Sequence, residues 1–264
     1  MQNIIMTVDF EGDFKGQASL TNNLNKILDL FDKYNASATF FVVGELIDKY
    51  PNIIKEIPKK HEIAAHGFRH RCLSKLNEDE LKNEIGLSKK SILKIRKKCL
   101  GFRAPYNIIH PELGALLKQE GFIYDSSICR SFFPGRYYAR GVSNYGYLAS
   151  KGNLKKRGGD ILEMPISSVS IFKLPFGLSF IKAFHPFYPL KSVKNNYLFY
   201  FHNYELDENP PKESLFFITK KLFKRKGGKE AYKILENILK NPEFKFISCK
   251  EFIKNKYPKL IKND

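Results

Sequence analysis

The stretch Ala64-Ala65-His66-Gly67-Phe68-Arg69-His70 ends an apolar run and places two histidines four residues apart. The run that precedes it, Glu62-Ile63-Ala64-Ala65, predicts a short interior strand that leads directly into His66. Two imidazoles this close can bind one divalent metal ion when a carboxylate from elsewhere completes the site. Because a chance pair of surface or core histidines is the commoner cause of such spacing, the surrounding pattern must decide.

A carboxylate cluster follows another apolar run near the N-terminus, in Thr7-Val8-Asp9-Phe10-Glu11-Gly12-Asp13. Successive side chains alternate in an extended chain, so Asp9 and Glu11 are expected on one face. Two carboxylates on one face need a compensating cation if that face is apolar. Considered alone, the cluster is explained equally well as a solvent-exposed strand end. Combined with the two histidines, it gives the ligand set of hydrolytic zinc sites and of non-haem iron centres.

Strand and helix patterns alternate through the first half of the chain. We expect strands at residues 4–9, 38–43, 62–65, 101–103 and 122–125, with helices beginning near Leu20, Leu46, Pro51, Asn77 and Pro111. This alternation predicts an α/β fold with parallel strands and covering helices. In barrels of parallel strands, chemistry collects at the C-terminal strand ends.

The second half of the chain is less regular. Residues 131–159 predict a long excursion, and the expected elements after it are strands at 161–164, 169–172, 197–201 and 244–247, a helix at 234–239, and a short last helix capped by Ser248. No repeat and no linker is visible. We therefore expect one domain over residues 1–264, with residues 206–264 as a C-terminal extension of it.

The segment Pro175–Leu190 is aromatic and proline-rich, and Lys182 is its only lysine, arginine or carboxylate. It packs across the barrel as a connection, or it dips into an anionic membrane beside a basic segment. The apolar residues concerned are Phe176, Leu178, Phe180, Ile181, Phe184, Phe187 and Tyr188, and the basic ones include Lys220, Lys221, Lys224 and Arg225.

The composition, 43% hydrophobic and 27% charged, is that of a globular protein. The net charge of +18 favours an anionic partner, or it reflects a lysine-rich solvated surface. We expect no signal peptide and no transmembrane helix, because no apolar run approaches the ~20 residues that span a bilayer. The expected location is the cytoplasm, including the inner membrane face, with reduced thiols at the widely spaced Cys72, Cys99, Cys129 and Cys249.

Polar groups end three further strands, in Arg103-Ala104-Pro105-Tyr106, in Tyr124-Asp125-Ser126-Ser127 and in Phe199-Tyr200-Phe201-His202. Read singly, each is ordinary. The five polar strand ends in this order resemble the polysaccharide deacetylase family, also called the NodB-homology or carbohydrate esterase four family. The resemblance runs from Ile4 to about Glu205, and it implies a distorted (β/α)7 barrel that removes acyl groups from sugars with a divalent metal ion.

Position by position, the resemblance assigns a role to each strand end. It implies that His66 and His70 bind the metal ion and that Asp9 is the general base. Arg103 would orient that base, and the backbone N–H of Tyr106 would contribute to the oxyanion hole. His202 matches the catalytic acid, and Asp125 matches an acidic residue that partners an arginine or the histidine acid.

The first motif departs from the usual Thr-Phe-Asp-Asp-Gly, because Phe10 stands where the family has its metal-binding carboxylate. A subgroup of the family resembles this chain in having an Asp-x-Asp or Asp-x-Glu form. We therefore assign Glu11 to the metal ion, with Asp13 as the alternative. The subgroup resemblance continues in Leu162-Glu163-Met164-Pro165 and in Phe201-His202-Asn203-Tyr204-Glu205, which is similar to a His-Pro-Trp-Glu ending.

The resemblance predicts a hydrolase that removes an N-acetyl group from an amino sugar, which is polymeric, oligomeric or lipid-linked. The expected cofactor is Zn²⁺, with Co²⁺, Ni²⁺, Mn²⁺ and Fe²⁺ as alternatives. Three other interpretations stay open: a deformylase or amidase for another N-acyl compound, a catalytically inactive carbohydrate-binding barrel, and a basic nucleic-acid-binding protein. The last is disfavoured, because the chain has no recognised reader motif and the acid–histidine cluster has no role there.

Overall fold

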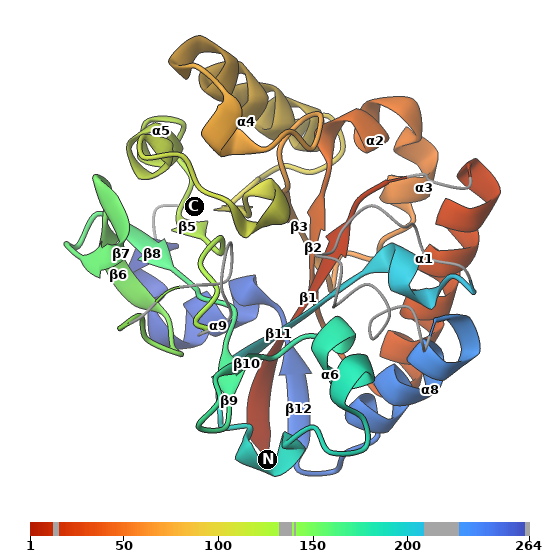
Figure 1. The fold of residues 1–264 in the computed structure, drawn as a ribbon. Coiled ribbons are helices and arrows are strands. Elements are labelled where there is room, and N and C mark those ends of the chain that lie inside the picture. Colours follow the sequence, from red (N-terminus) through yellow and green to blue (C-terminus); the bar gives the residue numbers. More distant parts are fainter. Residues whose placement is uncertain (13–15, 132–138, 140, 209–226, 262–264) are drawn as a thin grey trace.

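The computed structural model describes residues 1–12, 16–131, 139, 141–208 and 227–261 (Figure 1). Its strands are β1 Gln2–Phe10, β2 Thr39–Val42, β3 Glu62–Ala65, β4 Gly101–Phe102, β5 Tyr124–Asp125, β6 Tyr147–Ser150, β7 Asn153–Arg157, β8 Ile161–Glu163, β9 Ser168–Val169, β10 Leu174–Pro175, β11 Tyr197–His202 and β12 Phe244–Ile247. Its α-helices are α1 Gln17–Lys33, α2 Gly44–Lys49, α3 Pro51–Lys55, α4 Glu78–Leu93, α5 Leu113–Gln119, α6 Leu178–Phe184, α8 Gly228–Leu239 and α9 Cys249–Lys256.

The main sheet has the parallel order β11-β1-β2-β3-β4-β5-β8, and β6 and β7 continue it antiparallel from β8. It curls, and α4, α2, α3, α1 and α8 lie around its outside (Figure 1). Between β8 and β11, the backbone N–H of Ser167 donates to the carbonyl of Leu198 at 3.3 Å, in place of a strand ladder. These seven parallel strands with their covering helices confirm the predicted distorted (β/α)7 barrel.

Alternation along the strands produces two separate apolar cores. In β1, Ile4, Met6 and Val8 pack in the outer core between sheet and helices, whereas Ile5 packs in a second core inside the barrel. The other strands alternate likewise, so Phe41, Ala64, Tyr124, Leu162, Leu198 and Tyr200 line the interior. The strand ends that follow this inner face therefore bring their polar side chains to a common space.

Helix α9 closes the end of the barrel where the strands begin. Its Phe252 and Ile253 join the inner core. Its first turn is held by polar side chains: the N–H of Cys249 donates to Thr39 Oγ1 at 2.8 Å and that of Lys250 to Glu62 Oε2 at 2.8 Å. Because β12 also pairs with β1, the C-terminal stretch contributes both to the sheet and to the core.

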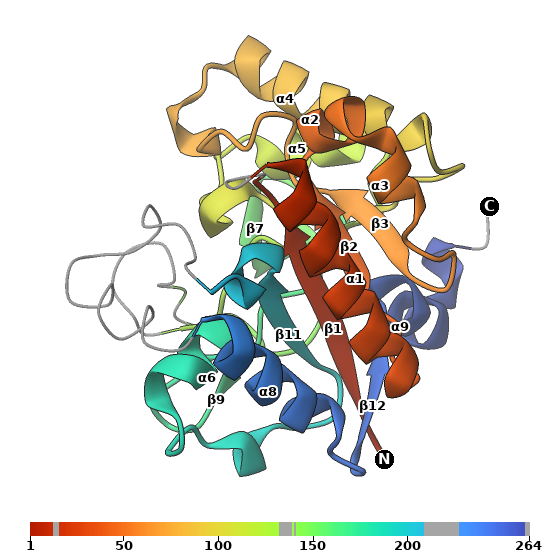
Figure 2. The ribbon, with the colours of Figure 1, turned by 90° about the vertical axis from the view of Figure 1, so that its right-hand side faces the viewer.

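The view at right angles shows α1 and α8 packed against the sheet beside β1 and β11 (Figure 2). Helix α1 buries Leu20, Leu24 and Ile27 on one face, as the 3.6-residue period requires. Helix α4 begins near Asn77 as expected, and a capping box holds its start: Asn77 Oδ1 accepts from the Glu80 N–H and Glu80 Oε2 accepts from the Asn77 N–H.

Three expectations for the second half need correction. The excursion contains the β6–β7 hairpin, and residues 175–190 contain the unexpected helix α6. The strand expected at 169–172 ends at Val169, because Ile171 and Phe172 lie in a turn and are 80% and 69% exposed. Such turns are set by tertiary packing of the flanking strands, which periodicity does not report.

The aromatic segment packs mainly inward. Of the seven apolar residues named in the sequence analysis, Phe176, Leu178, Phe180, Ile181 and Tyr188 are buried, whereas Phe184 and Phe187 are 37% and 90% exposed. This favours the interpretation as a packed connection. The basic residues Lys220, Lys221, Lys224 and Arg225 lie outside the described residues. Among the helices in the described ranges, none has the length and apolarity to cross a bilayer.

Candidate active site

Three side chains from two strand ends meet at one point. Glu11 follows β1, and His66 and His70 follow β3. Glu11 Oε2 lies 3.0 Å from His66 Nε2 and 2.5 Å from His70 Nε2. Buried His70 Nε2 makes no hydrogen bond with good geometry, although it points at the same oxygen. A single proton cannot bridge the Glu11 oxygen to both imidazole nitrogens. A divalent cation can bind the oxygen and the two nitrogens at once.

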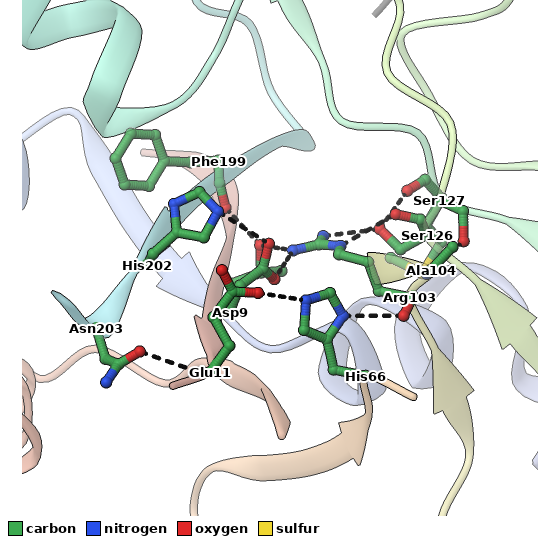
Figure 3. A network of polar contacts seen from close by, with 12 residues as sticks. Asp9, Glu11, His66, Arg103, Ala104, Ser126, Ser127, Phe199, His202 and Asn203 are labelled. Carbon is green, nitrogen blue, oxygen red and sulfur yellow. Dashed lines mark hydrogen bonds and ion pairs between the residues drawn. The ribbon is translucent and has the colours of Figure 1, made fainter. Parts of the chain in front are cut away.

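The second nitrogen of His66 supports this interpretation. His66 Nδ1 lies 2.9 Å from the carbonyl oxygen of Arg103, so it carries the hydrogen and donates (Figure 3). Nε2 is then left with a lone pair directed at Glu11. Metal-binding histidines are held in this way, with the outer nitrogen bonded to a carbonyl or carboxylate. The residues present therefore fit a metal ion.

Electrostatics keep the Glu11 carboxylate ionised. Burial opposes ionisation, but the charge of His70 and the close contacts with the His66 and His70 imidazoles hold the pKa of Glu11 well below its usual range. The Glu11 backbone N–H donates to Asn203 Oδ1 at 3.0 Å, which ties the end of β1 to the turn after β11. Asp13, the alternative ligand, lies outside the described residues.

The loop from His66 to His70 is fixed from two sides. Gly67 has φ 72°, and a Cβ there would approach Pro105 Cγ to 3.0 Å, so only glycine fits without a shift. Helix α4 contributes the buried Glu84, whose Oε1 accepts from the Arg69 N–H at 2.6 Å. His70 itself has φ 56°, a left-handed conformation that the surrounding contacts must maintain.

Arg103 crosses the barrel interior and binds Asp9. Its side chain is fully buried, and Nη1 donates to Asp9 Oδ1 at 2.6 Å (Figure 3). The other guanidinium nitrogens donate to Ser126, and the guanidinium lies 4.1 Å from the Phe41 ring centroid. Asp9 Oδ2 faces His202, 3.9 Å from its Nε2.

Asp125 is held elsewhere. Its two carboxylate oxygens accept from the hydroxyl and the backbone N–H of Ser127, at 2.7 and 3.1 Å. The neighbouring carboxyl group is that of Glu163, at the end of β8. Burial, then the proximity of Asp125, raises the pKa of Glu163 well above its usual range. Glu163 is therefore the protonated member of this carboxyl pair. Ser127 links Asp125 to the strand end that carries Arg103, because its hydroxyl oxygen also accepts from the Ala104 N–H at 2.8 Å.

The carboxylate that contacts His202 is Glu205. Glu205 Oε1 lies 3.1 Å from His202 Nδ1, and Glu205 Oε2 lies 2.6 Å from Lys182 Nζ. Burial opposes protonation of His202, but Glu205, Glu11 and Asp9 raise its pKa overall. Sequence reasoning did not assign Glu205 or Lys182 to the site. The available signals were the Phe201–Glu205 motif and the isolated charge of Lys182 in an aromatic segment.

Tyr106 lies beside the metal-ligand candidates. Its backbone has φ 61°, followed by Asn107 at φ 55°, and its ring centroid is 4.6 Å from that of His70. Two successive left-handed residues at a strand end are a strained turn of the kind that clusters at functional sites.

The N-terminal half of the chain matches a known family. Residues 3–124 match the sequence model described as "Polysaccharide deacetylase". A peptidoglycan-N-acetylglucosamine deacetylase of Bacillus cereus is 34% identical over 98 residues, which is 37% of this chain and 46% of that protein. A peptidoglycan deacetylase of Helicobacter pylori is 31% identical over 134 residues, 49% of this chain and 43% of that protein. The chain thus spans less than half the length of these curated relatives.

Solved structures share the fold. A protein from Mycobacterium smegmatis assigned to the polysaccharide deacetylases aligns with a TM-score of 0.63 at 15% identity, over 97% of this chain and 90% of that one. The Bc1960 peptidoglycan N-acetylglucosamine deacetylase aligns with a TM-score of 0.54 at 18% identity, over 94% and 86%. BA3943 of Bacillus anthracis, described as a pseudoenzyme of the same family, also gives 0.54, at 11% identity over 95% and 64%.

Proposed function

Because the chain belongs to the polysaccharide deacetylase family, we propose that it is a metal-dependent hydrolase that removes an N-acetyl group from an amino sugar. A pseudoenzyme with the same fold shows that fold alone is insufficient support. The observation that carries the proposal is the convergence of Glu11, His66 and His70 next to a base–acid pair, Asp9 and His202.

We assign the metal ion to Glu11, His66 and His70, and we propose zinc because two histidines and one carboxylate are typical of hydrolytic zinc sites. When bound there, a divalent cation would supply a Lewis acid that polarises the acyl oxygen and acidifies water. The other metals named above differ mainly in geometry and availability. Metal analysis of the purified protein would distinguish them.

The protein's own residues would move two protons. Arg103 holds Asp9 by Oδ1, so Asp9 Oδ2 is oriented to accept a proton from the attacking water. The water oxygen bonds to the acyl carbon, and the backbone N–H of Tyr106 would donate to the developing oxyanion. His202 Nε2 then donates a proton to the departing nitrogen as the C–N bond breaks. The products are acetate and a free amino sugar.

Acetate release tests this proposal. We expect the zinc-loaded protein to release acetate from N-acetylated chitooligosaccharides or peptidoglycan fragments, and Asp9→Asn to reduce kcat about 10²–10⁴-fold, as expected for loss of a general base. Asp160→Asn, a surface carboxylate 3.2 Å from Lys118, serves as the matched control. Near-wild-type turnover by Asp9→Asn would remove the base assignment, and no release from any acylated sugar would remove the function.

The same assay identifies which acyl group is removed and whether the sugar is polymeric, oligomeric or lipid-linked. An N-formyl substrate turned over faster than its N-acetyl counterpart would favour the deformylase alternative. Lipid-linked amino sugars are included because a lipid-linked substrate and peripheral contact with an anionic membrane remain hypotheses. Sedimentation with anionic vesicles at low salt checks the contact. A cytoplasmic location is likewise proposed, and the four cysteine thiols, which form no disulfide, support it.

A further inference from the structure

Helix α6 brings a buried lysine to the edge of the candidate site. The Lys182 side chain is 2% exposed, and its Nζ lies 2.6 Å from Glu205 Oε2, a side chain that is 3% exposed. Ser179, also on α6, donates its hydroxyl to the same oxygen at 2.8 Å. A buried ammonium group is costly unless it is paired, so a lysine at this position is stable only because Glu205 is ionised.

The second carboxylate oxygen of Glu205 contacts His202. Glu205 Oε1 accepts from the His202 backbone N–H at 3.2 Å and lies 3.1 Å from its Nδ1. An ionised carboxylate can only accept, so His202 Nδ1 carries a hydrogen. His202 Nε2 is then the nitrogen that faces Asp9 Oδ2. The ring is also stacked on Tyr204, at 4.9 Å between centroids, which limits its rotation.

Lys182 decides where the proton of this group resides. Burial opposes ionisation of Glu205, but the charge of Lys182 and the bond to His202 lower its pKa to about 2. Without the cation, buried Glu205 would compete with His202 for a proton. A protonated Glu205 no longer requires Nδ1–H on the imidazole, so the ring can adopt the other tautomer.

We propose that Lys182 is a positioning residue for His202: through Glu205 it keeps the imidazole in one orientation with Nδ1 protonated and Nε2 directed at Asp9. The consequence for proton donation rests on the proposed function, because only there does His202 act as an acid. The orientation itself does not depend on which reaction the site performs.

Histidine NMR tests the orientation independently of activity. In ¹⁵N-histidine-labelled protein, we expect the wild type and Lys182→Arg to show His202 with Nδ1 protonated. Lys182→Met, which keeps the length of the side chain but removes the charge, should show a mixture of tautomers. Lys191→Met, an exposed lysine in the next turn, is the matched control. A wild-type His202 signal in Lys182→Met would overturn the inference.

Leaving-group dependence tests the consequence. An amine leaves only when it is protonated, whereas p-nitrophenolate leaves without a proton, so p-nitrophenyl acetate needs no acid. We expect Lys182→Met to lower kcat for the N-acetyl sugar about 10–100-fold with KM unchanged, below the loss of the acid itself. Hydrolysis of p-nitrophenyl acetate should change little, and Lys182→Arg should restore amide turnover.

The outcomes separate the two hypotheses. Equal losses on amide and ester would show a merely structural role and would overturn the inference. If the wild type hydrolyses no amide, the proposed function fails, while the NMR result still decides the positioning claim. If Lys182→Met does not fold, Glu205→Gln is used with the same readouts, because it keeps the shape of the side chain. It should again spare the ester.

Discussion

Three side chains of the candidate site, those of His66, Asp9 and His202, have one atom held by the fold and a second directed at the shared centre. His66 is held at Nδ1 by the carbonyl of Arg103, and Asp9 is held at Oδ1 by the guanidinium of the same residue. His202 is held at Nδ1 by Glu205. Fixing one atom sets the tautomer or the lone-pair direction of the other, which is how a rigid scaffold orients a site.

Glu11 is the residue on which the metal hypothesis depends. We expect Glu11→Gln to weaken zinc binding by at least about 10–100-fold, because even outer contacts of a metal site have that effect. The measurement is competition with a chromophoric chelator. Asp13→Asn is the matched control, since it tests the alternative ligand. A loss of affinity in Asp13→Asn with none in Glu11→Gln would reverse the assignment.

At the scale of elements, α4 positions the loop between the two histidines. Glu84 accepts from the backbone N–H groups of Arg69, at 2.6 Å, and Arg71, at 3.5 Å, which lie on either side of His70. The start of the loop is held from α2, where the N–H groups of Gly44 and Glu45 donate to the carbonyls of Gly67 and Phe68, at 2.9 Å each, so Glu84 is the acceptor that brackets His70 itself. The geometry of one ligand therefore depends on packing between β3 and α4.

We expect Glu84→Ala to lower zinc affinity about 10–100-fold and to destabilise the protein by about 1–3 kcal/mol, because two backbone N–H groups lose their charged acceptor. Chelator competition and chemical denaturation measure the two effects. Glu78→Ala, an exposed residue in the first turn of the same helix, should leave zinc affinity unchanged. Unchanged affinity in Glu84→Ala would show that the loop holds its shape without α4.

At the scale of the whole molecule, stability should depend on a proton buried inside the barrel. Burial and the neighbouring Asp125 raise the pKa of Glu163, so the folded state retains a proton that the unfolded state releases. Stability is therefore highest below the unfolded pKa of Glu163 and falls as pH rises toward the folded one. The slope for one proton is at most about 1.4 kcal/mol per pH unit.

Glu163→Gln removes this titration and keeps both hydrogen bonds, since an amide can accept from the Ile128 N–H and donate to Asp125. We expect the variant to gain stability relative to the wild type as pH rises from about 5 to 8. Urea denaturation across this range measures it. Glu243→Gln, on the exposed turn before β12, should show no such gain. Parallel curves for wild type and Glu163→Gln would mean that Glu163 is ionised in the folded protein.

The amino-acid sequence by itself determined the strands of the barrel and the face on which its strand-end residues lie. Apolar runs and the two-residue period are local properties, so they placed Asp9 and Glu11 together and put His66 and His202 at strand ends. The order of those strand ends along the chain is the basis of the resemblance to the polysaccharide deacetylase family. The roles assigned to them, with Glu11 as ligand, stay predictions that the experiments above address.

Only the tertiary structure decided which charged groups meet. Lys182 and Glu205 come from different elements, and Glu163 joins Asp125 through neighbouring strands β5 and β8. The closure of the barrel by α9 also depends on residues such as Thr39 and Cys249, which are distant in the sequence. No local pattern encodes such pairs, because a buried charge is stabilised by whichever partner the packing of the whole chain brings within a few ångströms.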